Sequence, residues 1–477
     1  MSTIVWLRHD LRLADNAAFD FAVQRGGPVW PVFIAEPDGP WSPGGAARVW
    51  LHDSLAALAQ ELAAVGSRLV IRQGDPLDVL RELQAETGAT ALAFNARMEP
   101  AGRARDERVR TSLATALQIK VGNSSLLCRP DRIATGSGAP YRVFTPFWRQ
   151  VYASLRQHPT LPLSAPAQLP APDRWPASLT LESLALLPAK DWPMSLRQQW
   201  PAGAAVAHRV LAAFLDEAVD HYAVARDFPA LPGVSRLSPY LHNGQISPRQ
   251  VWHAVHERAA ARGALEPSER ELSWLRQLVW REFAHHLLWH FPTTPDAPLR
   301  PEFEAFPWCD DEPGYRRWCR GETGFPMVDA GMRELWQTGL MHNRVRMIVA
   351  SFLTKDLGVH WRRGAQWFWD TLVDANLANN TLGWQWTAGC GADAAPYFRV
   401  FNPITQSQKF DPDGAYLARW LPELAALSPA DRHAPWLASP LVLKAAGFEL
   451  GRDYPAPMLD HAAARHAALA RLEQSKR

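Results

Sequence analysis

The stretch at residues 28–35, PVWPVFIA, is a short apolar run of the kind that forms a buried strand. Helical periodicity, with apolar residues every three and four positions, is clear at residues 46–64. Further strand-like runs occur at residues 3–8 (TIVWLR), 68–72 (RLVIR), 90–94 (TALAF) and within 119–128. Buried strands that alternate with helices predict an α/β domain, a doubly wound parallel sheet, over residues 1–130.

Residues 131–203 interrupt this alternation. Prolines recur every few residues between Pro159 and Pro201, and proline removes a backbone donor and stops helices. We therefore expect an extended interdomain connector here. From residue 204 the pattern becomes helical, which predicts an all-α C-terminal domain over residues 204–477. Its amphipathic stretches lie at residues 204–220, 248–263, 269–290, 327–357 and 364–380.

Composition excludes several classes of protein. With 477 residues, 47% hydrophobic and 21% charged, the chain is an ordinary globular one, and no apolar run approaches the ~20 residues of a membrane helix. The net charge of +2 is nearly neutral, so an anionic partner must meet a local patch. The cysteines are too few for a disulfide framework or a zinc site, which predicts a cytoplasmic protein without metal. They are Cys128, Cys309, Cys319 and Cys390.

The sequence predicts two helix starts between residues 235 and 250. Ser247 and Gln250 have the spacing of a capping box, and Ser238 precedes a proline as a capping hydroxyl would. Gly244 stands where the first helix should end. A helix N-terminus preceded by Ser235 and Arg236 would suit a pyrophosphate, although ordinary capping accounts for the same residues.

Residues 342–355 predict a helix with a polar face. Asn343 and Met347 are one turn apart, Arg346 lies beside them and Arg344 is expected to point elsewhere. Five Lys or Arg residues against one acid between residues 341 and 363 make a local basic patch in a neutral chain. The segment 374–386, DANLANNTLGWQW, predicts an amide-rich loop that could bind a heterocycle, or an Asn-rich turn with core tryptophans.

The motifs follow one another in an order that resembles the photolyase/cryptochrome family along essentially the whole chain. They are WLRHDLR with DN at residues 6–16, GDP at 74–76, SRLSPYL at 235–241, WREF at 280–283, GFPMVDA at 324–330, the helix at 341–355, GWQW at 383–386 and AAPYFRVFNP at 394–403. This resemblance implies an N-terminal antenna domain and a helical domain that holds FAD in a folded conformation.

Site residues carried over from the resemblance form four groups. Those implied to bind FAD are Tyr222, Ser235, Arg236, Leu237, Ser238, Arg281, Arg346, Asp374, Asn376 and Asn380, the last facing flavin N5. Those implied to meet the damaged pyrimidines are Gln277, Trp280, Asn343, Met347 and Trp386. Those implied to bind DNA are Arg226, Arg344, Trp280 and Trp386. Those implied to carry electrons to the flavin are Trp384, Trp361 and Trp308.

The implied activity is light-driven repair of cyclobutane pyrimidine dimers, by electron transfer from excited reduced FAD to a flipped-out dimer in DNA. One alternative is a (6-4) photolyase, whose branch has histidines where this chain has Asn343 and Met347. The others are a cryptochrome-type blue-light receptor and a flavoprotein that binds DNA or a partner without turnover. Gln277 departs from the glutamate common in dimer photolyases. An amide can donate a hydrogen bond but cannot transfer a proton, which leaves the choice of lesion open.

The resemblance does not identify the antenna chromophore either. The Asn-Glu pair that holds folate in one photolyase group is replaced by Ala101 and Gly102, so methenyltetrahydrofolate in another pose, a deazaflavin or no antenna are the options. Iron–sulfur members use four cysteines in the helical domain, and this one has three, so we expect no cluster. We expect a monomer whose partner is damaged DNA.

Overall fold

The computed structural model describes residues 1–188, 192–393 and 398–475, so the first four residues of the motif at 394–403 lie outside it. Its described residues form two compact units. Unit 1 comprises Met1–Asp220 and Ser235–Pro292, and unit 2 comprises His221–Val234 and Thr293–Arg477.

The sheet of unit 1 confirms the predicted α/β fold. Within the described residues it has five parallel strands in the order β3-β2-β1-β4-β5. They are β1 (Thr3–Leu7), β2 (Val29–Ala35), β3 (Val70–Gln73), β4 (Ala91–Asn95) and β5 (Gln118–Gly122). Thr3 of β1 is in register with Val29 on one side and Ala91 on the other, so β1 lies at the centre, where the strand order reverses.

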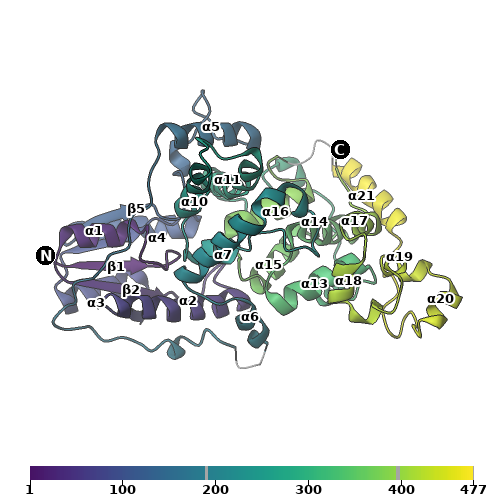
Figure 1. Cartoon of the computed structure of the whole chain (residues 1–477), viewed down its shortest axis with the longest axis horizontal. Coiled ribbons are helices and arrows are strands. Elements are labelled where there is room, and N and C mark those ends of the chain that lie inside the picture. The colour runs from purple at the N-terminus through teal and green to yellow at the C-terminus, as the bar shows by residue number, and fades with distance from the viewer. Residues whose placement is uncertain (189–191, 394–397, 476–477) are drawn as a thin grey trace. The chain divides into compact units, whose positions relative to one another are not determined.

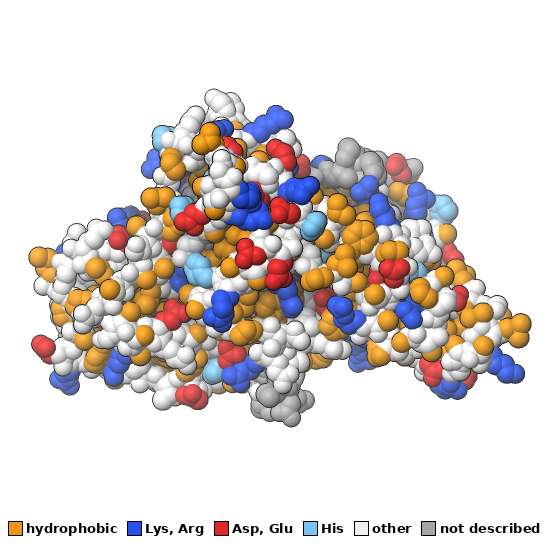
Figure 2. All heavy atoms as spheres, viewed as in Figure 1, with side chains coloured by type: hydrophobic (Ala, Val, Ile, Leu, Met, Phe, Trp, Pro, Cys, Tyr) orange, Lys and Arg blue, Asp and Glu red, His pale blue; other side chains and the backbone are white. Residues whose placement is uncertain are grey.

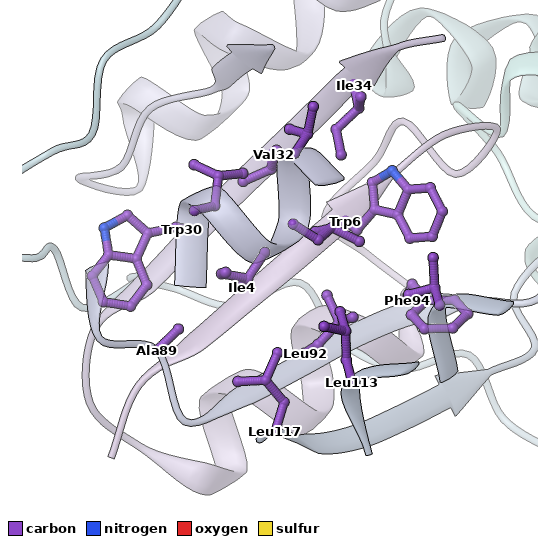
Figure 3. Close-up of a cluster of buried hydrophobic side chains, with 14 of the residues drawn as sticks. Ile4, Trp6, Trp30, Val32, Ile34, Ala89, Leu92, Phe94, Leu113 and Leu117 are labelled. Carbon is purple, nitrogen blue, oxygen red and sulfur yellow. The ribbon is translucent and has the colours of Figure 1, made fainter. Parts of the chain in front are cut away.

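Alternate side chains of these strands belong to two separate hydrophobic cores. Trp6 and Phe94 meet edge to face at 5.4 Å on one face of the sheet, together with Ile4, Val32 and Leu92, as Figure 3 shows. Val5 and Leu7 point to the opposite core. Two buried faces explain why the strands read as continuous apolar runs.

Two pairs of helices cover the faces of the sheet (Figure 1). Helices α1 (Ala17–Arg25) and α2 (Gly45–Ala64) pack on one face, and α3 (Pro76–Thr87) and α4 (Pro100–Leu113) pack on the other. The other helices of unit 1 are α5 (Phe144–Gln157), α6 (Pro193–Gln199), α7 (Ala204–Glu217), α9 (Ser238–Asn243), α10 (Pro248–Ala261) and α11 (Glu269–His290). The segment predicted as a connector, residues 131–203, is therefore only partly extended, because α5 and α6 lie in it. The domain boundaries at 130 and 203 stay a prediction.

The helix signals near residue 240 are confirmed except for one. Gly244 ends α9 at φ 70°, and a Cβ there would overlap the backbone of His9. Ser247 and Gln250 form the predicted capping box of α10. Ser238 does not cap α9, which is a correction. It already lies inside the helix, and the N-cap is Leu237, whose side chain has no acceptor.

Unit 2 is helical, as predicted, apart from short turns. Its helices are α8 (Tyr222–Ala225), α12 (Glu312–Arg320), α13 (Pro326–Thr338), α14 (Asn343–Ser351), the π-helical turn η5 (Phe352–Asp356), α15 (Trp361–Thr371), α16 (Leu377–Ala388), α17 (Pro403–Phe410), α18 (Ala415–Trp420), α19 (Pro429–Arg432), α20 (Pro440–Ala445) and α21 (His461–Ser475).

Two long stretches predicted in this unit are wrong in extent. Residues 327–357 form α13 and α14, because Gly339 ends α13 in the left-handed region at φ 66° and His342 begins a new helix. Residues 364–380 likewise divide between α15 and α16, and the segment predicted as an amide-rich loop at 374–386 is mostly α16. Asn376 caps that helix by accepting the amide of Asn379 at 3.1 Å.

The surface agrees with the near-neutral net charge. Figure 2 shows acidic and basic side chains interspersed over the face in view. None of the described helices combines the length and the apolar character that a membrane span requires. Any basic patch must therefore be sought locally.

Candidate functional site

The first turns of α14 gather three of the predicted lesion and DNA residues. Asn343 Nδ2 lies 4.0 Å from the sulfur of Met347, which confirms their shared face. Arg344 was expected to point elsewhere, and that expectation is wrong, because its Nη1 lies 3.9 Å from the same sulfur. The long arginine side chain folds back along the helix. Amide, thioether and guanidinium therefore form one polar cluster.

An acid from another segment holds Arg344 in this position. Asp227 accepts its Nη2 at 2.6 Å, and the ring of Phe410 lies 4.3 Å beneath the guanidinium carbon. Nε of Arg344 is buried without a hydrogen-bond partner among the described residues. Sequence reasoning missed Asp227, since nothing in the sequence pairs it with a residue 117 positions away.

His342 is the N-cap of α14 and adds a second buried donor. Its Nδ1 accepts the backbone N–H of Arg344 at 3.2 Å, which places the proton of the neutral ring on Nε2. Burial, followed by the charges of Arg344 and Arg346, lowers its pKa to about 4. Nε2 has no partner in the described part of the chain. A neutral N–H is thus left without a hydrogen bond beside the polar cluster.

Arg346 joins α14 to the segment before α16. Its Nη2 donates to both carboxylate oxygens of Asp374, at 3.1 and 3.2 Å, and its Nε donates to the carbonyl of Met341 at 2.7 Å. The side chain of Asp374 is only 6% exposed, so this pair is held in one geometry. The structure brings together two of the residues that the resemblance implies to bind FAD.

Helix α16 presents the remaining predicted amides. Asn376 caps the helix, and Asn380 follows one turn later. Nδ2 of Asn380 donates to the carbonyl of Ala365 at 2.9 Å, which fixes the amide and leaves its oxygen as an acceptor. The Nε1 of Trp386 donates to the carbonyl of Asp393 at 2.9 Å.

The three predicted electron-transfer tryptophans differ in exposure. Trp384 and Trp361 are buried, at 2% and 1% exposed, whereas Trp308 is partly exposed. Trp384 on α16 packs against α15 where Gly364 has no Cβ, because a Cβ there would overlap the indole. Trp361 is the first residue of α15. Of the three, only Trp308 has a ring that solvent reaches.

The segment His221–Val234 supplies two further residues of unit 2. Tyr222 is buried, which raises its pKa to about 12, and the guanidinium of Arg226 lies 5.3 Å from its ring. The charge of Arg226 also reaches His342.

Helix α11 carries three of the predicted site residues of unit 1. Gln277, Trp280 and Arg281 recur at three and four positions and share a face. The indole of Trp280 stacks on Phe144 of α5, with centroids 3.8 Å apart and planes 8° from parallel, and meets Phe283 edge to face. Phe144 was missed from the sequence, where it is one aromatic of the run at 144–152.

Arg281 and Glu282 are tied to the chain before η1 (Pro130–Arg132). Nη1 of Arg281 donates to the carbonyl of Ser125 at 2.8 Å, and a carboxylate oxygen of Glu282 accepts the amide of Cys128 at 3.2 Å. Burial raises the pKa of Glu282 to about 7, although Arg281 opposes the shift. Glu282 therefore positions its neighbours and changes charge near neutrality.

The residues predicted to bind the FAD phosphates precede α9. Leu237 and Ser238 begin the helix, and Arg236 has a positive φ of 54°. This conformation carries the guanidinium over the ring of Trp200 at 4.5 Å. Ser235 is partly exposed beside it. An unusual backbone conformation for a non-glycine residue marks a segment that the surrounding structure constrains.

Unit 1 also has a hollow of about 560 Å³ beside α4. Arg103 donates to the carbonyl of Trp289 at 3.0 Å, and its guanidinium covers the Trp289 ring at 3.5 Å. Arginines outnumber acids along the walls, whose other members are Ala96, Arg97, Met98, Pro100, Ala104, Asp106, Glu107, Arg110, Val121, Arg129, Asp131 and Pro292. Within residues 1–188, 192–393 and 398–475, no His, Cys, Asp and Glu side chains cluster as metal ligands would.

Comparison with known proteins shows which family this chain resembles. Residues 3–172 match the family described as DNA photolyase, and residues 274–474 match the FAD binding domain of DNA photolyase. A deoxyribodipyrimidine photo-lyase of Agrobacterium fabrum is 48% identical over 98% of this chain and 96% of its own. Cryptochrome-1 of Arabidopsis thaliana is 36% identical over 99% of this chain and 70% of its own.

Two solved structures resemble this chain along nearly its whole length. The crystal structure of a bacterial class III photolyase from Agrobacterium tumefaciens has a TM-score of 0.96 at 48% identity, and covers 100% of this chain and 98% of that one. A Synechocystis cryptochrome has a TM-score of 0.89 at 28% identity, over 98% and 99% of the two chains.

Proposed function

Because this chain belongs to the DNA photolyase family, we propose that it repairs cyclobutane pyrimidine dimers in DNA, driven by blue light, with reduced FAD as the electron donor. The observation that carries the choice of lesion is the cluster on α14. Asn343 and Met347 touch there, at the two positions where the (6-4) branch has histidines. An amide and a thioether suit the carbonyls and apolar edges of a pyrimidine dimer, whereas (6-4) repair needs an imidazole proton donor.

The residues of unit 2 fit FAD. Among the described residues, Nε2 of His342 and Nε of Arg344 are buried donors without a hydrogen-bond partner, and the same helix carries the Arg346–Asp374 ion pair. Buried donors of this kind call for an acceptor that a bound ligand would supply. Asn380 adds an immobilised amide acceptor. Reduced FAD, when bound, would supply the electron that light makes available. In unit 2, the residues that would hold it are Arg346, Asp374, Asn376, Asn380 and Tyr222. In unit 1, the resemblance implies the same role for Ser235, Arg236, Leu237, Ser238 and Arg281.

The remaining residues would bind the lesion. In unit 1, Trp280 is braced by Phe144 and offers a rigid flat surface on which an extruded base could stack. In unit 2, Trp386, whose Nε1 donates to the carbonyl of Asp393, would offer a base the same kind of surface. Gln277 donates a hydrogen bond without giving up a proton. Arg344 and Arg226 would neutralise backbone phosphates around the lesion, which positions the strand without reading its sequence.

An antenna belongs to the same proposal. Methenyltetrahydrofolate combines a flat pterin with anionic carboxylates, and the hollow beside α4 offers arginines and the Arg103–Trp289 stack. We place the antenna there. We further propose a monomer in the reducing cytoplasm, where its four free cysteines persist.

The test uses FAD-reconstituted, chemically reduced protein and three DNA substrates: an oligothymidylate with cyclobutane dimers, one with a (6-4) product and an undamaged strand. Thymine absorbance should return only with the first substrate and only in light. Repair of the (6-4) product alone would identify the second branch of the family, and no repair of either would favour a light receptor. The double variant N343A/M347A should lose repair yet keep FAD, whereas R362A, at an exposed ion pair, is the matched control.

A further inference from the structure

A short backbone pairing in unit 2 brings Trp308 beside the start of α15. Cys309 and Val359 form a parallel bridge, and the amide of Cys309 donates to the carbonyl of Gly358 at 2.8 Å. The residues that flank this bridge are Trp308 on one strand and His360 on the other. Their ring centroids lie 5.0 Å apart. Backbone geometry, and not chance side-chain packing, therefore sets this contact.

The imidazole of His360 is fixed from the other side by α15. Its Nδ1 accepts the backbone N–H of Arg362 at 3.0 Å, so His360 is the N-cap of the helix whose first residue is Trp361. The rings of His360 and Trp361 are 5.5 Å apart and 31° from parallel. One aromatic ring thus contacts two of the three tryptophans predicted to carry electrons.

The protonation state suits that position. Because Nδ1 is an acceptor, the neutral ring carries its proton on Nε2. Burial, followed by the charge of Arg362, lowers the pKa of His360 to about 4. The ring is therefore neutral at physiological pH, and a positive charge on either indole is not repelled by an imidazolium.

We propose that His360 is a relay between Trp361 and Trp308 in the photoreduction of bound flavin. The inference rests on the proposed function, since it assumes that the tryptophans reduce FAD. With oxidised FAD bound, blue light would draw one electron from Trp384, and Trp361 would return one electron to Trp384. One electron then passes from Trp308 through the His360 ring to the Trp361 radical cation. Trp308 is left oxidised, and its indole proton leaves to water, which the partly exposed ring can reach.

The test separates the ring of His360 from its capping role. H360N keeps a capping side chain but removes the ring, and H360F keeps an aromatic ring but removes the cap. Both are compared with the unaltered holoprotein and with W308F. Transient absorption measures the yield of the long-lived tryptophan radical, and nitrogen-15 NMR of the histidines reports the tautomer. Melting temperatures check that each variant is folded.

The expected result is a several-fold lower radical yield in H360N and W308F, a yield in H360F close to that of the unaltered protein, and an Nε2–H neutral ring at position 360. A yield in H360N equal to that of the unaltered protein, with W308F impaired, would overturn the inference alone, since Trp308 would then reach Trp361 without the imidazole. An unimpaired W308F would instead remove the tryptophan chain from the proposed function, and the relay with it. An imidazolium at neutral pH would also contradict it.

Discussion

Helices α11 and α14 carry site residues in opposite ways. On α11, Trp280 is held by two aromatic rings, Phe144 stacked on it and Phe283 edge to face. On α14, Arg344 and Arg346 are held by acids, Asp227 and Asp374. Contacts on α11 hold an aromatic ring in position, whereas contacts on α14 hold two charged guanidinium groups in position. Substitutions on α11 should therefore act independently of salt, and substitutions on α14 should not.

The largest expected effect lies on the charged side. R346A removes the guanidinium that pairs with the carboxylate of Asp374, which is only 6% exposed, and removing one member of a buried ion pair costs about 3–5 kcal/mol. We expect a variant that melts earlier and retains little FAD through gel filtration. The control R362A breaks an ion pair whose side chains are 41% and 62% exposed, and should change either quantity little. Equal effects in both variants would contradict the assignment.

The next effect belongs to α11 and appears as a pH dependence. Glu282 has a pKa of about 7 in the folded protein against an ordinary 4.5, so the folded state binds more protons between these values. Stability should therefore fall by up to about 3 kcal/mol as pH rises through this window, because a pKa difference of one between the folded and unfolded states corresponds to about 1.36 kcal/mol. Urea unfolding at several pH values measures it. The E282Q variant should show a flatter profile over the same window, and an unchanged profile would mean that another group titrates there.

Salt distinguishes the two helices directly. R344A removes one cation from the proposed phosphate contacts, and should weaken binding of dimer-containing DNA by about 1.5 kcal/mol. The slope of log affinity against log salt should become shallower by about 0.9. Fluorescence anisotropy over a salt series provides both numbers. A weaker affinity with an unchanged slope would mean that Arg344 acts through shape.

The smallest expected effect is that of the stack itself. F144L removes the ring beneath Trp280, and aromatic pairs contribute about 0.5–1.5 kcal/mol beyond the area they bury. Affinity for the dimer should fall by that amount, with the salt slope unchanged. The neighbouring V143A, at a side chain 49% exposed, should bind as the unaltered protein does. A change in slope for F144L would erase the contrast between the helices.

Local signals predicted the fold better than the site. Apolar runs located the strands, and the Ser247–Gln250 box and Gly244 located helix ends, because each depends on residues a few positions apart. The same periodicity joined α13 to α14, since it continues across the turn at Gly339 that separates them. The prediction that Ser238 caps α9 was wrong by one residue, because the helix begins at Ser238 and its N-cap is Leu237.

Partners distant in sequence escaped prediction altogether. Asp227, Phe144 and His360 position predicted site residues, yet each does so through a contact that only the tertiary structure creates. The orientation of Arg344 was mistaken for the same reason. Helix geometry directs its Cα–Cβ bond, but Asp227 decides where the guanidinium lies.

The visible absorption spectrum of the purified protein tests the central claim most directly, since repair, photoreduction and the His360 relay all need the protein to retain FAD. We expect flavin bands that survive gel filtration at one FAD per chain, in the protein as isolated or after reconstitution, and that vanish in R346A. A colourless protein that takes up no flavin when supplied with it would contradict the claim.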